Sequence, residues 1–250
     1  GGLPSSQVIC MAMDRDGAVW LGTSQGPVVF YNPSAVFRSS FNATRLKIQQ
    51  EQFVGYLLGT EQIMSIAVDG ANRKWFGTYG GGVFLLSEDG TKQLLNFNTD
   101  NSPLPSNNIA CMTVDNLTGE LFIGTDKGVV SYRSDATSGG SVCDGYYAFP
   151  NPVKHDYNGP IAIRGLVDDA DVRITDTAGN LVYHTKALGG QAIWDGKEEF
   201  YTAKQEFWFD TKEQTLEFFY EKGSSYGPGN YEVKLYVDKQ YLGSSSFVIE

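Results

Sequence analysis

The sequence predicts an all-β protein, with a partial β-propeller of about three four-stranded blades followed by a β-sandwich. One observation is a sequence motif that recurs three times in the first half. Its Gly-Thr pairs begin at residues 22, 77 and 124, so the copies are 55 and 47 residues apart. A repeat of about 40–50 residues made of short strands is typical of propeller blades. The second observation is composition, because 29 Gly, 14 Tyr and 15 Phe indicate turns and strands.

The first copy shows how one repeat becomes a blade. Large and small side chains alternate over residues 9–13, which predicts a strand. The sequence Asp-Arg-Asp-Gly at residues 14–17 predicts a hairpin turn, because Asp-Gly supplies positive φ angles. Residues 18–23 and 28–31 then predict the second and third strands. The fourth strand is less clear, and its candidates are residues 41–48 and 92–97.

An aromatic residue occupies the same position in each copy. These residues are Trp20, Trp75 and Phe122. We expect their rings to fill the space between neighbouring blades, and the glycines that follow to let the backbones approach closely. Cys10 and Cys111 are also equivalent, and we expect both to be small buried side chains that do not form a disulfide with each other.

An aspartate also recurs at the end of the first strand of each copy. These residues are Asp14, Asp69 and Asp115. One carboxylate per repeat at a strand end is typical of a turn cap, and we expect caps rather than metal ligands. Three blades do not close a ring, so we expect blades upstream of residue 1, or another chain, to complete it.

The repeat resembles the two-component regulator propeller family over roughly residues 3–133. The shared wording is an Asp-x-x-Gly turn, then Trp-(Ile/Leu)-Gly-Thr, then a glycine and an aromatic residue. The resemblance implies one of two settings. These are the periplasmic sensor half of a hybrid two-component kinase and a surface protein of the type IX secretion system.

A polar stretch rich in Gly and Ser separates the repeats from a second unit. We predict propeller blades over residues 1–137, a linker over 138–148, a sandwich over 149–197, and a closing part over 198–250. Short alternating segments at residues 161–164, 170–176, 181–184 and 191–196 predict the strands of the sandwich.

The sequence of the second unit is similar to that of the Ig-like C-terminal domain of type IX secretion proteins. It holds Pro-Asn-Pro-Val at 150–153, Gly-Leu at 165–166, Val-x-Ile-x-Asp-x-x-Gly-Asn-Leu-Val from 172, and Trp-Asp-Gly from 194. That domain is similar to the Ig-like unit of the flagellar hook-cap protein FlgD. The resemblance therefore implies an Ig-like β-sandwich.

One departure from that pattern leaves two alternatives open. Residues 198–226 stand between Trp-Asp-Gly and the next expected strand. They are either an insertion, with Gly229-Asn-Tyr231 beginning the usual Gly-x-Tyr strand, or the tail is a separate Ig-like module or a join.

The resemblance to type IX secretion proteins implies a non-enzymatic component at the cell surface or outer membrane. It implies partner proteins such as a PorU-like sortase, and binding of anionic lipopolysaccharide. The alternative function is a periplasmic ligand-sensing ectodomain of a hybrid two-component regulator. A net charge of −10 argues against nucleic acid as a partner, and no apolar run is long enough for a transmembrane segment.

The sequence offers no catalytic, cofactor or metal motif, and neither histidine has a motif partner. We therefore predict no enzyme activity, no cofactor and no metal. The candidate contacts to a glycan or phosphate are the basic residues of the sandwich. These are Arg164, Arg173, Lys154 and Lys186.

Overall fold

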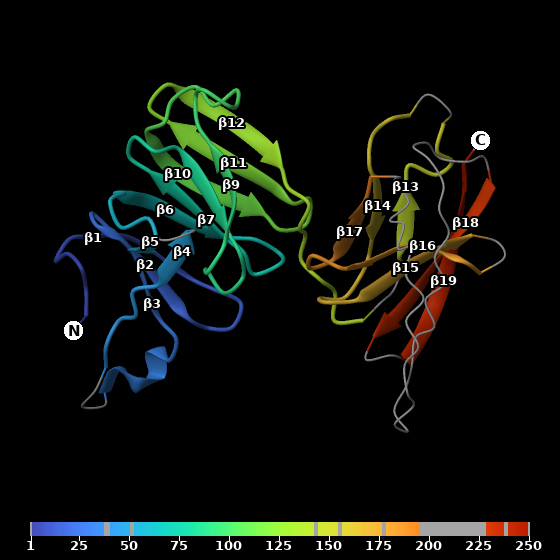
Figure 1. The fold of residues 1–250 in the computed structure, drawn as a ribbon, viewed down its shortest axis with the longest axis horizontal. Helices are drawn as coiled ribbons and strands as arrows, with labels where there is room; N and C mark the ends of the chain where they lie inside the picture. Colours follow the sequence, from blue (N-terminus) through green and yellow to red (C-terminus); the bar gives the residue numbers. More distant parts are fainter. Residues whose placement is uncertain are drawn as a thin grey trace. The chain divides into compact units, whose positions relative to one another are not determined.

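The computed structural model describes residues 2–37, 41–50, 53–142, 145–154, 157–176, 179–195, 229–237 and 240–249. Contacts divide the chain into two compact units, Gly1–Ser134 and Asp135–Glu250. Antiparallel strands build both units, and the described residues form one short 3-10 helix, η1 (Pro33–Phe37), and no α-helix (Figure 1). The prediction of an all-β protein is confirmed.

The first unit repeats one plan of small antiparallel sheets. The first sheet has the order β1 (Val8–Met13), β2 (Val19–Thr23), β3 (Gly26–Phe30). The second has the order β6 (Ile63–Val68), β7 (Lys74–Thr78), β8 (Val83–Leu86), β9 (Gln93–Phe97). The third has the order β10 (Ile109–Asp115), β11 (Glu120–Thr125), β12 (Gly128–Arg133). Each sheet corresponds to one predicted blade.

The fourth strand is complete in the second sheet alone among the three. There β9 pairs with β8, as expected for residues 92–97. In the first sheet the candidate at residues 41–48 contributes one isolated bridge, between Thr44 and Val29. The adjoining residues instead form a separate hairpin of β4 (Lys47–Gln50) and β5 (Phe53–Tyr56).

Aromatic side chains pack between adjacent sheets of the first unit. Trp20 on β2 meets Phe76 on β7 edge to face, with ring centroids 5.9 Å apart. Trp75 on β7 meets Tyr132 on β12 in the same way, also at 5.9 Å. Trp20 and Trp75 are 1% and 0% exposed, so these two rings fill the space between blades as predicted.

A glycine two residues after each of these tryptophans makes this close packing possible. A methyl group added at Gly22 would lie 2.7 Å from Cγ2 of Ile63 on β6. That distance is far inside van der Waals contact, so the neighbouring sheet is as close as a glycine allows.

The outer faces of the first and third sheets expose apolar side chains. Phe122 on β11 is 42% exposed and Val129 on β12 is 73% exposed, while Met11 and Met13 on β1 are 70% and 66% exposed. Cys111 is exposed on the same face of the third sheet. The predicted burial of Phe122 and Cys111 is therefore wrong, because the described residues place no further sheet against them.

The second unit consists of two sheets around one hydrophobic core. One sheet has the order β13 (Tyr147–Phe149), β14 (Ile161–Arg164), β17 (Gln191–Trp194). The other has the order β16 (Leu181–Lys186), β15 (Asp171–Asp176), β18 (Gly229–Val237), β19 (Gln240–Ile249). Side chains from both sheets meet in the core, where Ile161, Ile163, Trp194, Val172 and Ile174 are buried.

The closing strands join the same sheet as the strands before them. β18 pairs with β15 from Asp171↔Tyr236 to Asp176↔Tyr231. The strands at 229–249 therefore share one sheet with β15 and β16. The insertion alternative stays a prediction. Residues 198–226, to which that alternative assigns the insertion, lie outside the described residues.

The second unit begins earlier than the sequence predicted. Ala136 is fully buried, and the Thr137 N–H donates to the Leu188 carbonyl at 3.3 Å. The Gly140 N–H donates to the Leu166 carbonyl at 3.0 Å. Residues 136–140 therefore pack on the second unit, whereas the sequence assigned them to the blades and the linker. Among the described residues, no helix has the length and apolar character needed to cross a bilayer.

Candidate functional site

Arg164 lies at the end of β14 with two exposed aromatic residues near it on β13. Ile161 and Ile163 point into the core, so the alternation of the strand places Arg164 on the outer face. Arg164 is paired directly with Tyr147, and Phe149 lies two residues further along the same face. Tyr147 and Phe149 are 50% and 64% exposed. This face offers a cation beside two aromatic surfaces.

Arg173 and Lys186 lie on the outer face of the other sheet. The register pairs Arg173 with His184 and Asp171 with Lys186, so all four residues share one face. Arg173 Nη2 lies 3.2 Å from Asp171 Oδ2, and the His184 ring also contacts Asp171. The charge of Arg173 is therefore partly balanced within the sheet.

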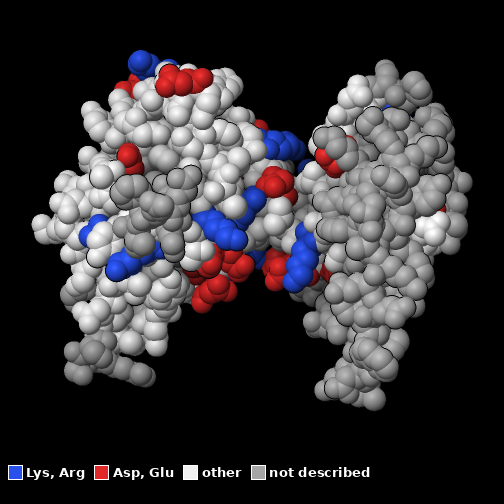
Figure 2. Space-filling view, in the orientation of Figure 1, with Lys and Arg blue, Asp and Glu red and all other residues white. Residues whose placement is uncertain are grey.

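Lys154 is exposed in the segment after Val153, whose N–H donates to the Val248 carbonyl at 3.1 Å. The structure thus does not bring the four predicted basic residues together. Arg164 and the Arg173–Lys186 pair lie on different sheets of the sandwich. Figure 2 shows basic side chains beside acidic ones on the visible face of the first unit.

The recurring aspartates of the first unit cap the turn between the first two strands of each sheet. Asp14 Oδ1 accepts the N–H of Ala18 at 2.9 Å, and Asp69 Oδ1 accepts the N–H of Arg73 at 3.0 Å. Asp115 Oδ1 accepts the N–H of Leu117 at 3.0 Å. The prediction that these carboxylates cap turns is confirmed.

The indole N–H groups add to the first two caps. Trp20 Nε1 donates to Asp14 Oδ2 at 2.9 Å, and Trp75 Nε1 donates to Asp69 Oδ2 at 3.3 Å. In the third repeat Phe122 carries no such donor. One side chain therefore fills the space between sheets and also satisfies the buried aspartate.

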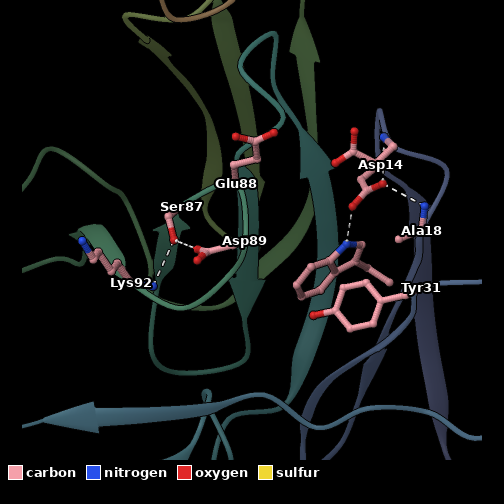
Figure 3. Close-up of a pocket in the computed structure, with 9 residues that line it drawn as sticks. Asp14, Ala18, Tyr31, Ser87, Glu88, Asp89 and Lys92 are labelled. Atoms are coloured by element: carbon pink, nitrogen blue, oxygen red, sulfur yellow. Dashed lines mark hydrogen bonds between the residues drawn. The ribbon is translucent and has the colours of Figure 1, made fainter. Parts of the chain in front are cut away.

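A cavity of about 590 Å³ opens between the first and second sheets of the first unit (Figure 3). Its lining comes from the capped turn of the first sheet, from the residue after β3, and from the loop between β8 and β9. The lining residues are Asp14, Asp16, Ala18, Trp20, Tyr31, Ser87, Glu88, Asp89 and Lys92. Four of these nine residues are acidic.

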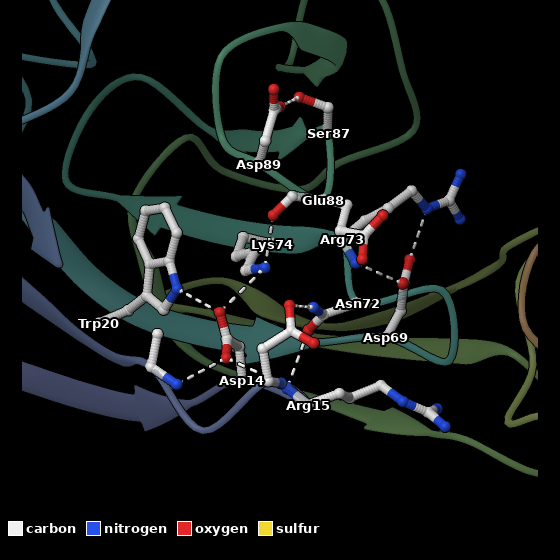
Figure 4. Close-up of polar contacts among 12 residues, drawn as sticks. Asp14, Arg15, Trp20, Asp69, Asn72, Arg73, Lys74, Ser87, Glu88 and Asp89 are labelled. Carbon is white, nitrogen blue, oxygen red and sulfur yellow. Dashed lines mark hydrogen bonds and ion pairs between the residues drawn. The ribbon is translucent and has the colours of Figure 1, made fainter. Parts of the chain in front are cut away.

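A buried lysine neutralises the deepest of these acids (Figure 4). Lys74 Nζ lies 3.1 Å from Asp14 Oδ2 and donates to the Glu88 carbonyl at 2.6 Å. Burial raises the pKa of Asp14, but hydrogen bonds from Trp20 and Lys74 outweigh it and leave that pKa below its usual value. Asp14 is therefore ionised and paired.

The acids at the rim of the cavity carry the remaining charge. The Ser87 hydroxyl and the Thr91 N–H lower the pKa of Asp89 to about 2. Burial, together with the charges of Asp89 and Asp14, raises the pKa of Tyr31. The cavity is thus a region of negative potential with an aromatic wall. Within the described ranges, no three His, Cys, Asp or Glu residues are grouped closely enough to hold a metal ion.

Two family models match parts of the chain. The two component regulator propeller model matches residues 2–25, and a domain of unknown function (DUF8428) matches residues 167–250. The second match spans residues on both sides of the segment 198–226. No curated protein matches the chain in sequence.

One solved structure matches nearly the whole chain. PorZ, an essential surface component of the type-IX secretion system of Porphyromonas gingivalis, is 31% identical over 97% of this chain, with a TM-score of 0.60. This chain spans 30% of the length of PorZ. The extracellular domain of a hybrid two-component system from B. thetaiotaomicron covers 99% of this chain and matches over 50% of its own length. It is 14% identical, with a TM-score of 0.42.

Proposed function

The chain is a PorZ-like protein with two-component regulator propeller repeats, and on this premise we propose that it acts at the cell surface in type IX secretion, by binding and not by catalysis. The observation that carries the proposal is the 31% identity to PorZ over 97% of the chain. The likeness to PorZ extends over both units, and the propeller repeat model matches the start of the first. The protein partners we propose are secretion-machinery proteins such as a PorU-like sortase.

We further propose that the outer face of β13 and β14 contacts anionic lipopolysaccharide. Sugar rings stack on exposed aromatic side chains, and Tyr147 and Phe149 present such surfaces. A guanidinium binds phosphate through paired hydrogen bonds, and Arg164 lies directly opposite Tyr147. These three residues combine the two chemistries that an anionic glycan requires.

Arg173, Lys186 and Lys154 are weaker members of this proposal. The ion pair with Asp171 already occupies Arg173, so a phosphate there competes with a carboxylate. Lys154 and Lys186 are exposed point charges, and an ammonium group lacks the paired, planar donors of a guanidinium. The alternative function, a ligand-sensing ectodomain, stays a prediction.

The test is retention of anionic lipopolysaccharide by the full chain, with lipopolysaccharide stripped of its acidic groups as the reference. Two charge reversals form a matched pair, because Arg164→Glu changes the aromatic face and Arg173→Glu changes the other sheet. We expect Arg164→Glu to weaken retention about tenfold and Arg173→Glu to weaken it about twofold at most.

If the wild-type chain does not retain anionic lipopolysaccharide, the proposed lipopolysaccharide contact is wrong. Equal losses in the two variants contradict the assignment to Arg164. Both side chains lie on outer faces, so we expect both variants to fold. Circular dichroism of the two variants checks this.

A further inference from the structure

At one position of the cavity wall, the first and second repeats carry side chains of very different size and charge. Ala18 and Arg73 are equivalent, because each donates its backbone N–H to an aspartate four residues earlier. The tryptophan two residues later donates to the same aspartate in both repeats. The local structure is therefore the same, and the side chain alone changes.

In the second repeat a guanidinium fills the space above the capped turn. Arg73 Nε donates to Asp69 Oδ2 at 2.8 Å, and its Nη2 donates to the Ser134 hydroxyl at 2.9 Å. Arg73 is 7% exposed. In the first repeat Ala18 ends at its Cβ, and the cavity of about 590 Å³ opens at this position. A guanidinium is thus the group that the second repeat places at this position. In the first repeat Lys74 Nζ contacts Asp14 Oδ2, the oxygen equivalent to the one that Arg73 Nε contacts, so the open space lies beyond this ion pair.

The charge of the cavity also favours a cation. Lys74 balances Asp14 from the second sheet, and the rest of the lining holds three acids, Asp16, Glu88 and Asp89, and one base, Lys92. The Asn72 amide donates to Asp16 Oδ2 at 2.8 Å, and this contact does not neutralise that carboxylate. The rim therefore keeps an excess of negative charge, which a ligand with one positive charge reduces.

An aromatic wall suits a flat cation better than a compact one. Tyr31 lines the cavity and is 57% exposed, so part of its ring is open to a ligand. Guanidinium groups stack on such rings. The chain itself holds an example, because the Arg45 guanidinium carbon lies 3.9 Å from the centroid of the Tyr56 ring.

We propose that the cavity between the first two sheets binds an arginine side chain of a partner polypeptide, held between the Tyr31 ring and the carboxylates of Asp16, Glu88 and Asp89. This inference names the chemistry of one partner contact, and in that respect it rests on the proposed function. Anionic lipopolysaccharide is repelled by this cavity, so the two contacts are separate.

The probe is the tripeptide Gly-Arg-Gly, titrated into the full chain and followed by NMR or calorimetry. Gly-citrulline-Gly has nearly the same shape without the charge, and Gly-Lys-Gly has the charge without the planar group. We expect Gly-Arg-Gly to bind saturably, Gly-Lys-Gly to bind several times more weakly, and Gly-citrulline-Gly to show at least about a tenfold loss.

Two substitutions locate the binding. Ala18→Arg supplies a guanidinium from the chain itself, and we expect it to abolish tripeptide binding. Ala18 is 4% exposed, so circular dichroism of this variant is measured beside the titration, and Glu88→Gln tests the same location from the exposed rim. Glu88→Gln removes one rim charge and weakens binding a few-fold. Asp100→Asn changes an exposed acid outside the cavity and leaves binding unchanged.

Absent binding of Gly-Arg-Gly overturns the proposal, and so does equal binding of the citrulline or lysine peptide. Binding that survives Ala18→Arg overturns the location. Lipopolysaccharide retention is measured on the same variants. We expect Ala18→Arg to leave this retention unchanged, so failure of the cavity proposal can be distinguished from failure of the lipopolysaccharide proposal.

Discussion

Gly77 on β7 faces Ile109 on β10 so closely that an added Cβ would lie 2.5 Å from Cγ2 of that isoleucine. The second and third sheets therefore meet at a distance that a glycine permits and an alanine does not. Gly22 and Ile63 repeat the relationship one sheet earlier. This contact between sheets is what makes the repeats consecutive blades and not independent hairpins.

Gly77→Ala is expected to destabilise the protein by about 1–3 kcal/mol, because the new methyl group overpacks the space between two sheets. Gly124→Ala is the matched control at the equivalent position of the third sheet. There the nearest atom is the Cys111 sulfur, at 2.9 Å on the same sheet, and no other sheet among the described residues lies near. Urea denaturation gives both free energies of unfolding. Equal losses would show that the sheets do not pack as described.

The two cysteines of the repeats are expected to differ in reactivity. Burial raises the pKa of Cys10 to about 11, and its thiol contacts the Ile63 carbonyl on the next sheet at 3.8 Å. Cys111 occupies the same position on the third sheet and is exposed. Iodoacetamide should label Cys111 at least about tenfold faster than Cys10 in the native protein.

Peptide mapping by mass spectrometry separates these two sites from Cys143, which lies outside the described residues. In denaturant the two rates should become equal. Fast labelling of Cys10 in the native state would contradict the packing of the first sheet against the second.

Asp14 is expected to stabilise the folded protein at neutral pH, and this contribution is expected to be lost in acid. Its pKa in the folded protein lies below the usual value, so its contribution is complete above the unfolded value of about 3.8 and is lost as the pH falls through the folded pKa. Asp14→Asn should therefore flatten the fall of stability below about pH 4. At neutral pH it should cost about 3–5 kcal/mol, because Lys74 stays buried without its anion.

Melting temperatures of both proteins between pH 2 and pH 7 measure this effect. Asp100→Asn, on an exposed loop, controls for the change of net charge and should leave the profile of the wild-type protein intact. An unchanged profile for Asp14→Asn would contradict the buried ion pair.

Features that all three repeats share, such as the strands and the turn caps, could be predicted from the sequence. Features that arise from differences between the repeats could not. The spacing of Trp20 and Trp75 fixed their place between sheets, because equivalent residues of a repeat share one environment. Phe122 broke this rule, since its burial requires a neighbouring sheet that the described residues do not contain. The cavity depends on differences between aligned positions, such as Ala18 in place of Arg73, and a shared repeat pattern does not predict these.

The basic residues of the sandwich show a second limit. Strand alternation places Arg164 and Arg173 on outer faces, and this much could be predicted from the sequence. Their assignment to different sheets depends on β14 pairing with β17 and β15 pairing with β16, which local patterns do not determine. The aromatic partner Tyr147 likewise becomes visible through the register of β13 and β14.

The most direct test of the central claim is the amount of type IX cargo attached to the cell surface when the gene for this protein is deleted and then restored. We expect that deletion removes attached cargo, that the wild-type gene restores it, and that the Arg164→Glu allele restores it less well than Arg173→Glu. Cargo attachment that is unchanged by the deletion would contradict a role in type IX secretion.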